Sequence, residues 1–387
     1  MKNTYVKSLD GLRAIAVLVV MSFHAQITHF GWAGVQLFFV LSGFLITGIL
    51  WNEKYADTAV GYKLKKFWVR RTLRIFPLYF TYLLLLCVFY LLFHLPGHYP
   101  DHLVALFTYT FNLTKAFPHW HSGVWQGDPA YSHLWSLSIE EQFYLLFPLI
   151  VFLCPAWLVR GLMIGIIFLA PLIRWSLCQY YTHIGLPADA LGDTIYWNTL
   201  THLDAFFLGG IIPVMGLDRR IRRPVLLFAS MAGVVFVAGL VNFATSRSGS
   251  YYFNDLGYNY AQTAHYEYVW HYSVLSLFFA SLILLLVSEH AKGKFSRLLK
   301  AFLEDRRMVR IGKVSYGIYI FHWGILAYFY NPFFHSDNLF KKVLLFIPYA
   351  IIVYIVAELS FTFYESWFIK WKDIFFGSNK VAAPRAV

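Results

Sequence analysis

The chain has 387 residues, of which 59% are hydrophobic and only 13% are charged, and its mean hydropathy is +0.55. A water-soluble domain of this size does not need so much apolar surface, and the apolar stretches recur at membrane-spanning length. The net charge of +12 could suit nucleic acid, but the sequence contains no nucleic-acid-binding module, so we expect no such partner. The composition predicts an all-α, polytopic membrane protein.

Apolar stretches at ten places predict a bundle of about ten transmembrane helices. The first lacks a small-residue cleavage site and leads straight into the second, unlike a cleavable signal peptide. We expect residues 1–376 to form one transmembrane domain and residues 377–387 to form a disordered tail. The ten stretches lie near residues 14–31, 33–51, 75–94, 142–158, 161–181, 200–216, 225–243, 271–289, 314–331 and 343–363.

Lysine and arginine are distributed unevenly between the connecting segments. If the N-terminus is cytoplasmic, the cytoplasmic segments hold 27 of the 32 basic residues. This bias agrees with the positive-inside rule, whereas an odd number of spans would place basic loops on both faces. The sequence therefore predicts that both termini are cytoplasmic, and most of the net positive charge reflects topology.

The first apolar stretch carries Arg13 and His24, eleven positions apart. In a helix these side chains share one face and lie roughly 16 Å apart, with Arg13 at one rim of the bilayer and His24 near its middle. Ionisable groups at membrane depth indicate function, and the pair would suit a long ligand that is anionic at one end and reactive at the other. His24 is a candidate general base; the alternative is a structural histidine bonded to a backbone carbonyl. Asp10, close to Arg13, is a second candidate, or only a helix N-cap.

An arginine cluster, Arg70, Arg71 and Arg74, lies where the third apolar stretch begins. Arg71 and Arg74 are neighbours on one helix face. Because guanidinium binds phosphate in a bidentate manner, the cluster predicts a phosphate site. The alternative is a positive-inside anchor.

Two adjacent glutamates, Glu140 and Glu141, enter the outer end of the fourth apolar stretch. Ser138 and Glu141 fit a capping box, which would account for one carboxylate. We expect at least one of the two glutamates to face an aqueous or protein-lined cavity. Further polar candidates in or beside the apolar stretches, each of which could instead make an interhelical hydrogen bond, are His202, Asp204, His322 and Glu365.

The segment from about 95 to 132 is expected to be a solvated, aromatic-rich external loop that covers the site or contacts an acceptor. Its histidines are His98, His102, His119 and His121, and its aromatic residues include Trp120, Trp125 and Tyr131. No carboxylate or cysteine completes a metal site, so we predict no metal. The aromatic side chains would stack on sugars or belong to the interfacial aromatic belt.

Five ordered motifs carry a resemblance to a known family. They are Ser8-Leu-Asp-Gly-Leu-Arg13 with its Arg-x10-His24 spacing, Gly34-Val-Gln-Leu-Phe-Phe-Val-Leu-Ser42-Gly43, Arg70-Arg71-x-x-Arg74-Ile-x-Pro77, Trp135-Ser-Leu-x-x-Glu140-Glu141-x-Phe-Tyr144, and Ser315-Tyr316-Gly-Ile-Tyr-Ile-Phe-His322-Trp. Over nearly its whole length the chain resembles the acyltransferase-3 family of bacterial integral membrane proteins.

This resemblance implies transfer of an acyl group, usually acetyl from cytosolic acetyl-CoA, to a hydroxyl. The acceptor would be a glycan or lipid-linked sugar of a surface polysaccharide or lipopolysaccharide, or a small molecule such as a macrolide. It implies a multi-pass protein of the bacterial inner membrane that contacts membrane lipids, and it leaves the oligomeric state open, a homodimer included. The implied catalytic residues are His24, Arg13, Asp10, Glu140 and Glu141, the CoA-binding residues are Arg70, Arg71, Arg74 and Arg13, and the substrate-binding residues are Tyr144, Asp204, His322 and Trp135.

The chain departs from the usual family pattern at several positions. Gln36 replaces a common aspartate, His202 stands where arginine is frequent, and Trp367 replaces the proline that often follows the glutamate at Glu365. The SGNH domain fused to some members does not follow the last apolar stretch. We therefore expect the membrane domain to perform acyl transfer alone, or to pass the group to a separate partner.

Two alternatives concern function and mechanism. A transporter or flippase of a lipid-linked sugar could use the same polar interior as a pathway, without dependence on acyl-CoA. Within an acyltransferase, His24 could deprotonate the acceptor directly or carry the acyl group covalently.

Overall fold

The structure is a computed structural model that describes residues 5–93, 99–117, 128–245, 255–261, 263, 266–334 and 336–376. Within these ranges the regular elements are helices, without a strand, which confirms the all-α prediction. The α-helices are α1 (Lys7–His24), α2 (Ala33–Lys54), α3 (Val60–Phe93), α4 (Tyr99–Phe107), α5 (Leu113–Ala116), α6 (Pro129–Ser132), α7 (Trp135–Leu153), α8 (Ala156–His183), α9 (Ala188–Tyr196), α10 (Leu203–Met215), α11 (Leu217–Arg220), α12 (Pro224–Thr245), α13 (Glu267–Val287), α14 (Lys294–Leu303), α15 (Arg306–Lys313), α16 (Ser315–Gly324), α17 (Asn331–Phe334), α18 (Leu339–Ser360) and α19 (Ser366–Phe376).

Seven helical runs of the described chain are long and apolar enough to cross a membrane. Three further predicted stretches fall on α1, α10, and α16 with its π-helical continuation η5 (Ile325–Tyr330). Of these, α1 carries three charged residues and α10 has only 13 residues. A polytopic helical bundle is thus confirmed, while the count of ten spans and the side of the termini stay predictions.

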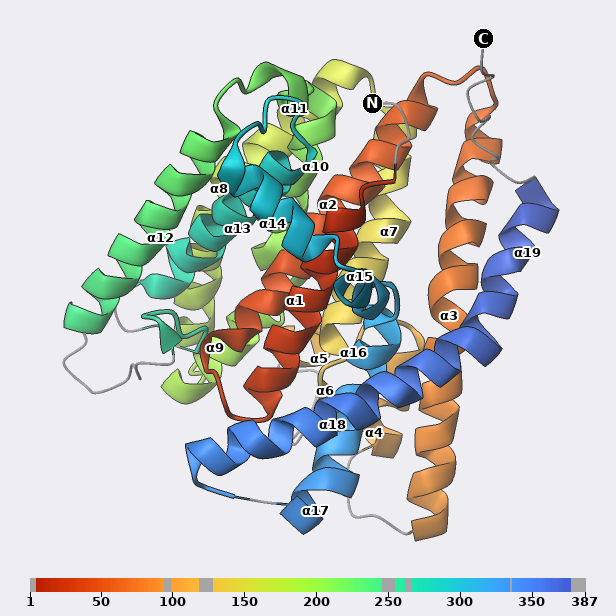
Figure 1. The fold of residues 1–387 in the computed structure, drawn as a ribbon, viewed down its shortest axis with the longest axis vertical. Coiled ribbons are helices and arrows are strands. Elements are labelled where there is room, and N and C mark those ends of the chain that lie inside the picture. Colours follow the sequence, from red (N-terminus) through yellow and green to blue (C-terminus); the bar gives the residue numbers. More distant parts are fainter. Residues whose placement is uncertain are drawn as a thin grey trace.

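Most of the long helices stand roughly alongside one another in Figure 1, with α8, α12 and α13 on one flank and α3 and α19 on the other, whereas α18 crosses them obliquely. The end of α2, the start of α3 and the short helix α11 lie at the same end of the molecule. These elements belong to the arginine- and lysine-rich segments. Their position at one end is what the predicted topology requires.

Two helices start well before the apolar stretches that fall on them. The first stretch is expected near 14–31, whereas α1 starts at Lys7, because its polar first turns are buried within the protein, and it ends at His24. His24 is therefore the last residue of its helix. In turn, α3 begins at Val60, well before the apolar stretch expected at 75–94, because the helix continues through its basic first turns.

The centre of the bundle is a close crossing of α2 and α10. A Cβ on Gly43 would lie 1.9 Å from the Phe206 carbonyl oxygen, and one on Gly209 would lie 2.0 Å from the Val40 carbonyl oxygen. Larger residues would force the helices apart. Small residues let membrane helices approach closely and gain van der Waals contact without a hydrophobic driving force.

The prediction of a solvated loop at 95–132 was wrong for its described part. Helices α4, α5 and α6 fold back onto the bundle, and both His102 and Tyr131 are buried. His102 Nδ1 lies 3.2 Å from the Tyr131 hydroxyl. Apolar residues between the polar ones, such as Leu106 and Phe111, pack into the core and carry the segment inward. The other histidines and tryptophans named above in this segment (His98, His119, His121, Trp120, Trp125) and the tail 377–387 lie outside the described residues.

Candidate active site

Three adjoining cavities enter the bundle. The rim cavity has a volume of about 450 Å³ and is basic. The middle cavity, about 100 Å³, shares Arg71 and Arg74 with the rim cavity. The histidine cavity, about 190 Å³, shares Val35 and Tyr319 with the middle cavity. The shared lining residues show that the three cavities follow one another as a series of neighbours.

The arginine cluster lies at the first junction of this series. Arg71 and Arg74 line both the rim and the middle cavity, whereas Arg70 lines the rim cavity alone. The Arg71 guanidinium also lies over the Tyr144 ring, 5.8 Å from its centroid. Since Lys63 and Lys66 add their ammonium groups to the rim cavity, this entrance is suited to a polyanionic ligand.

Arg13 lines the middle cavity and is supported by Asp10. Asp10 Oδ1 accepts a hydrogen bond from the Arg13 guanidinium at 2.9 Å, and its other oxygen accepts one from Tyr5. The alternative that Asp10 is only an N-cap was wrong, because α1 begins at Lys7 and Asp10 lies inside its first turn.

Glu140 and Glu141 both line the middle cavity, together with Arg13 and the arginine cluster. Ser42 donates to Glu140 Oε1 at 2.6 Å and lies 2.9 Å from the Tyr144 hydroxyl. The predicted capping box was wrong, because α7 starts at Trp135 and the Ser138 hydroxyl donates to Leu134 within the helix. Because Glu140 and Glu141 line the middle cavity and not the histidine cavity, they lie beside the arginines.

His24 lines the histidine cavity and forms a hydrogen-bonded pair with the buried His322. His24 Nδ1 lies 2.8 Å from His322 Nε2, and His322 Nδ1 lies 2.6 Å from the Tyr319 carbonyl oxygen. A carbonyl only accepts, so His322 Nδ1 carries its proton and neutral His322 accepts through Nε2. His24 must then donate through Nδ1, which leaves its Nε2 lone pair free. This tautomer is assigned from the hydrogen-bond network.

Two aromatic neighbours fix the orientation of these rings. Trp323 stacks on His24 with centroids 3.9 Å apart and an interplanar angle of 14°. His133 Nε2 donates to the Ile320 carbonyl at 3.1 Å, and its ring lies against His322. Among the described residues, His133 Nδ1 has no hydrogen-bond partner. It therefore remains a second acceptor nitrogen beside the cavity.

The rest of the histidine cavity is aromatic, with one ion pair. Lys115 Nζ lies 2.5 Å from Asp193 Oδ2 and 4.5 Å from the centroid of the Trp197 ring. Burial lowers the pKa of Lys115, and the neighbouring Asp193 partly opposes that shift. The aromatic wall consists of Phe23, Trp32, Trp135, Tyr196, Trp197, Tyr260, Tyr319 and Trp323. Aromatic walls with a few polar groups are typical of sites for small organic ligands.

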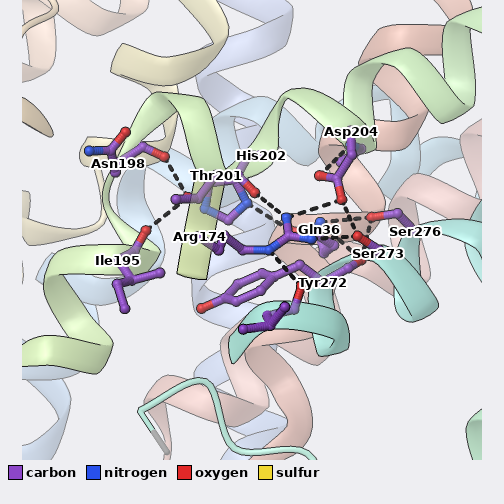
Figure 2. Close-up of polar contacts among 12 residues, drawn as sticks. Gln36, Arg174, Ile195, Asn198, Thr201, His202, Asp204, Tyr272, Ser273 and Ser276 are labelled. Atoms are coloured by element: carbon purple, nitrogen blue, oxygen red, sulfur yellow. Dashed lines mark hydrogen bonds and ion pairs between the residues drawn. The ribbon is translucent and has the colours of Figure 1, made fainter. Parts of the chain in front are cut away.

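Asp204, predicted to bind substrate, lies instead in a buried polar network (Figure 2). Its carboxylate pairs with Arg174 at 3.1 Å and accepts from Ser273 at 2.5 Å, and both charged side chains are fully buried. Arg174 donates further to the carbonyls of Val269 and Thr201. Asp204 lines none of the three cavities, so the structure does not bring it together with His24.

A comparison of the sequence with known families decides the class of the protein. The family model described as an acyltransferase domain matches residues 6–361. The chain belongs to the acyltransferase-3 family. The resemblance seen in the five motifs is thereby confirmed, and this membership and the apolar helices together make the chain a multi-pass membrane protein.

Curated relatives of this acyltransferase-3 chain are named as O-acetyltransferases. O-acetyltransferase OatA of Staphylococcus aureus strain NCTC 8325 / PS 47 is 30% identical over 382 residues, covering 94% of this chain and 57% of that protein. The putative O-acetyltransferase SACOL0978 of S. aureus strain COL is 28% identical over 384 residues, covering 95% and 58%. The chain thus spans somewhat more than half the length of these relatives. No solved structure matches the chain.

Two departures from the acyltransferase-3 pattern contact each other. Gln36 on α2 and His202 at the start of α10 are fully buried, and Gln36 Oε1 lies 3.0 Å from His202 Nδ1 (Figure 2). Gln36 Nε2 donates to Ser276 Oγ at 2.8 Å, and His202 Nε2 lies 2.6 Å from the Tyr196 carbonyl. An amide–imidazole pair therefore occupies the place where the resemblance implies aspartate and arginine, and both ring nitrogens of His202 face carbonyl oxygens.

We expect that replacing Gln36 by aspartate and His202 by arginine preserves the stability of the protein only when both residues are replaced together. Gln36→Asp alone buries a carboxylate and loses the hydrogen bond that Gln36 Nε2 donates to Ser276, and His202→Arg alone buries a cation beside an amide, so each should cost about 1–3 kcal/mol. The double variant regains a charge pair, with a coupling energy of roughly 0.5–3 kcal/mol. Thermal unfolding of the four purified proteins measures this coupling. Additive losses would show that the pair is not coupled.

Sequence reasoning missed several residues of the site. His133, Tyr319 and Trp323 surround the histidine pair, although each lies in or beside a quoted motif. Arg174 entered the topology argument only as a basic residue outside the cytoplasmic segments. A lone arginine in an apolar stretch, however, indicates a buried anionic partner, which here is Asp204.

Proposed function

We propose that this chain is a membrane O-acyltransferase that moves an acyl group, acetyl in the first instance, from acyl-CoA to a sugar hydroxyl. The observation that carries the proposal is the series of three adjoining cavities, basic at the rim and imidazole-lined at the far end. Family membership and the names of the relatives support acyl transfer. The positive-inside pattern of the loops favours the bacterial inner membrane, with the rim cavity facing cytosolic CoA.

The donor would enter through the rim cavity. Arg71 and Arg74, with Arg70 behind them, would hold the phosphates of CoA, because guanidinium groups bind phosphate oxygens through paired hydrogen bonds. The narrower middle cavity would then take the pantetheine arm past Arg13 and Glu140. This route leads the thioester towards the wall that the middle and histidine cavities share at Tyr319.

His24 would act as the general base at the far end. Its free Nε2 removes the proton of the acceptor hydroxyl while the hydroxyl oxygen attacks the thioester carbonyl carbon. The carbon–sulfur bond then breaks, and the thiolate of CoA takes the proton from His24. His322 holds His24 in the required tautomer and accepts its Nδ1 hydrogen bond throughout. An acyl-histidine relay would use the same Nε2 lone pair as nucleophile.

The acceptor would occupy the histidine cavity. Its aromatic wall, with Trp135 and Trp197 stacked at 5.6 Å between centroids, offers flat apolar faces for a sugar ring. Lys115 and Asp193 provide hydrogen bonds to hydroxyls at the opposite side. A sugar of a surface polysaccharide or lipopolysaccharide fits this chemistry, and the cavity needs no metal ion for the reaction.

We expect acetyl-CoA to raise the thermal unfolding midpoint of the purified protein, and Arg71→Ala/Arg74→Ala to remove most of that shift. Each charge-assisted hydrogen bond contributes about 1.5–3 kcal/mol, so the double variant should bind at least tenfold more weakly. Arg297→Ala is the matched control, because this exposed arginine on α14 lines none of the three cavities. The paired assay follows transfer from radiolabelled acetyl-CoA to cell-envelope glycans.

Two outcomes would contradict the proposal. If millimolar acetyl-CoA leaves the unfolding midpoint of the wild-type protein unchanged and no label is transferred, the chain does not use this donor. Movement of an unmodified lipid-linked sugar across vesicles, independent of acyl-CoA, would instead identify a transporter that uses the same polar interior.

A further inference from the structure

A separate hollow, the α18 groove, lies outside the rim, middle and histidine cavities, between α1, α15, α16 and α18. It has a volume of about 690 Å³. None of its residues lines the rim, middle or histidine cavity. The groove is lined by Leu18, Met21, Ile311, Ile318, Phe346, Ile347, Ala350, Ile351 and Tyr354, with Arg306, Arg307 and Arg310 at one end.

The three arginines of the groove differ in what they contact. Arg310 is already paired with Glu358, and its guanidinium lies over the Phe361 ring at 5.2 Å. Arg306 and Arg307 are exposed and form no ion pair with any residue that the structure describes. The nearby Asp305 carboxylate is used as the N-cap of α15. Two guanidinium groups at the mouth of an apolar groove therefore lack an anion.

The apolar part of the groove is long enough to take much of one acyl chain. Phe346 and Tyr354 on α18 mark its two ends, and eight residues of helix rise about 12 Å. Helix α18 crosses the other long helices obliquely in Figure 1, so this is a length along the helix and not a depth in the bilayer.

We propose that this groove binds an anionic glycerophospholipid, with its phosphate at Arg306 and Arg307 and one acyl chain along α18. A zwitterionic lipid would leave the net positive charge of the two guanidinium groups unbalanced, so we expect selection for an anionic headgroup. A lipid-linked acceptor sugar is a poorer occupant, because it would have to pass Phe346 into a small cavity of about 50 Å³ to reach His24.

The groove is also placed to stabilise the start of α1. Helix α15 packs so closely on α1 that a Cβ on Gly312 would lie 1.8 Å from the Asp10 carbonyl oxygen. A lipid bound between α15 and α18 would therefore help to hold α15 against α1, the helix that carries Asp10 and Arg13. We expect binding to raise the thermal unfolding midpoint as well.

The test measures phospholipid binding to the purified full chain in detergent micelles by native mass spectrometry. The two probes are phosphatidylglycerol and phosphatidylcholine with identical acyl chains. We expect tighter binding of phosphatidylglycerol to wild type, and about 30-fold weaker binding to Arg306→Gln/Arg307→Gln, with phosphatidylcholine unaffected. Arg222→Gln/Arg223→Gln is the matched control for charge, since these exposed arginines do not line the groove, and it should bind like wild type.

A second variant tests the acyl-chain position. Ala350→Phe fills the apolar part and should weaken both lipids, while Ala350→Leu does so to a smaller degree with less risk to folding. The proposal is overturned by equal binding of both lipids to wild type. It is also overturned by retained phosphatidylglycerol preference in Arg306→Gln/Arg307→Gln, by an equal loss in the charge control, or by wild-type binding of both lipids to folded Ala350→Phe.

Discussion

The His24→Ala variant should bind acetyl-CoA normally and transfer acetyl groups about 10²–10⁴-fold more slowly than wild type, the usual contribution of a general base. The physical reason is the free Nε2 lone pair, which exists because His24 Nδ1 is occupied by His322. Binding should survive because the arginine cluster is remote from His24 in the cavity series. The measurement is kcat for transfer from labelled acetyl-CoA, with the thermal shift by acetyl-CoA as the test of folding and binding.

His322 provides the matched control for this prediction. His322→Gln can still place a hydrogen-bond acceptor near His24 Nδ1, whereas His322→Ala cannot, so the glutamine variant should retain more activity. Both variants should lower kcat and leave the Michaelis constant for acetyl-CoA nearly unchanged, because neither changes the donor entrance. Wild-type transfer by folded His24→Ala would rule out His24 as base and as acyl carrier alike.

The sequence predicted the parts of the site that depend on local spacing. Arg13 and His24 do lie on one helix, because a long apolar stretch without a helix-breaking residue favours a helix within a membrane bundle. Arg71 and Arg74 likewise line the same two cavities. These relations need only the geometry of one helix.

Relations between distant helices could not be predicted in the same way. His24 and His322 are separated by 298 positions, and nothing in either motif states that their rings meet. The capping box at Ser138 failed for a related reason, since tertiary packing of Trp135 and Leu137 extends α7 by a turn beyond the local signal. Hydropathy also placed the first helix too late, because it cannot distinguish a polar turn that is buried in protein from one that is exposed.

Asp204 shows how an ionisable residue in a membrane helix can be structural. Sequence alone gives it the same status as Glu140, because both are acidic residues in apolar surroundings. The structure separates them by their partners: Glu140 faces a cavity, whereas Asp204 is saturated by Arg174 and Ser273. At such positions a functional role is therefore indicated by access to a cavity and by hydrogen-bonding groups without a partner in the protein, not by burial alone.

The Asp204→Ala variant should accordingly be the least stable of those considered, with a loss of about 3–5 kcal/mol in the free energy of unfolding. Removal of the carboxylate leaves the Arg174 guanidinium buried without its anion, although the Val269 and Thr201 carbonyls still accept from it. The double variant Arg174→Met/Asp204→Leu removes both charges and should recover much of the loss. Denaturant unfolding in micelles measures the difference.

The comparison with a more exposed pair makes this prediction specific. Lys66 and Glu53 lie 2.6 Å apart at the rim with side chains 17% and 32% exposed, so Glu53→Ala should cost less than about 1 kcal/mol. If Asp204→Ala costs no more than Glu53→Ala, the buried pair does not stabilise the contact between α8 and α10. If the double variant is as unstable as Asp204→Ala, the loss comes from packing rather than from an unpaired charge, and the electrostatic account of the network in Figure 2 fails.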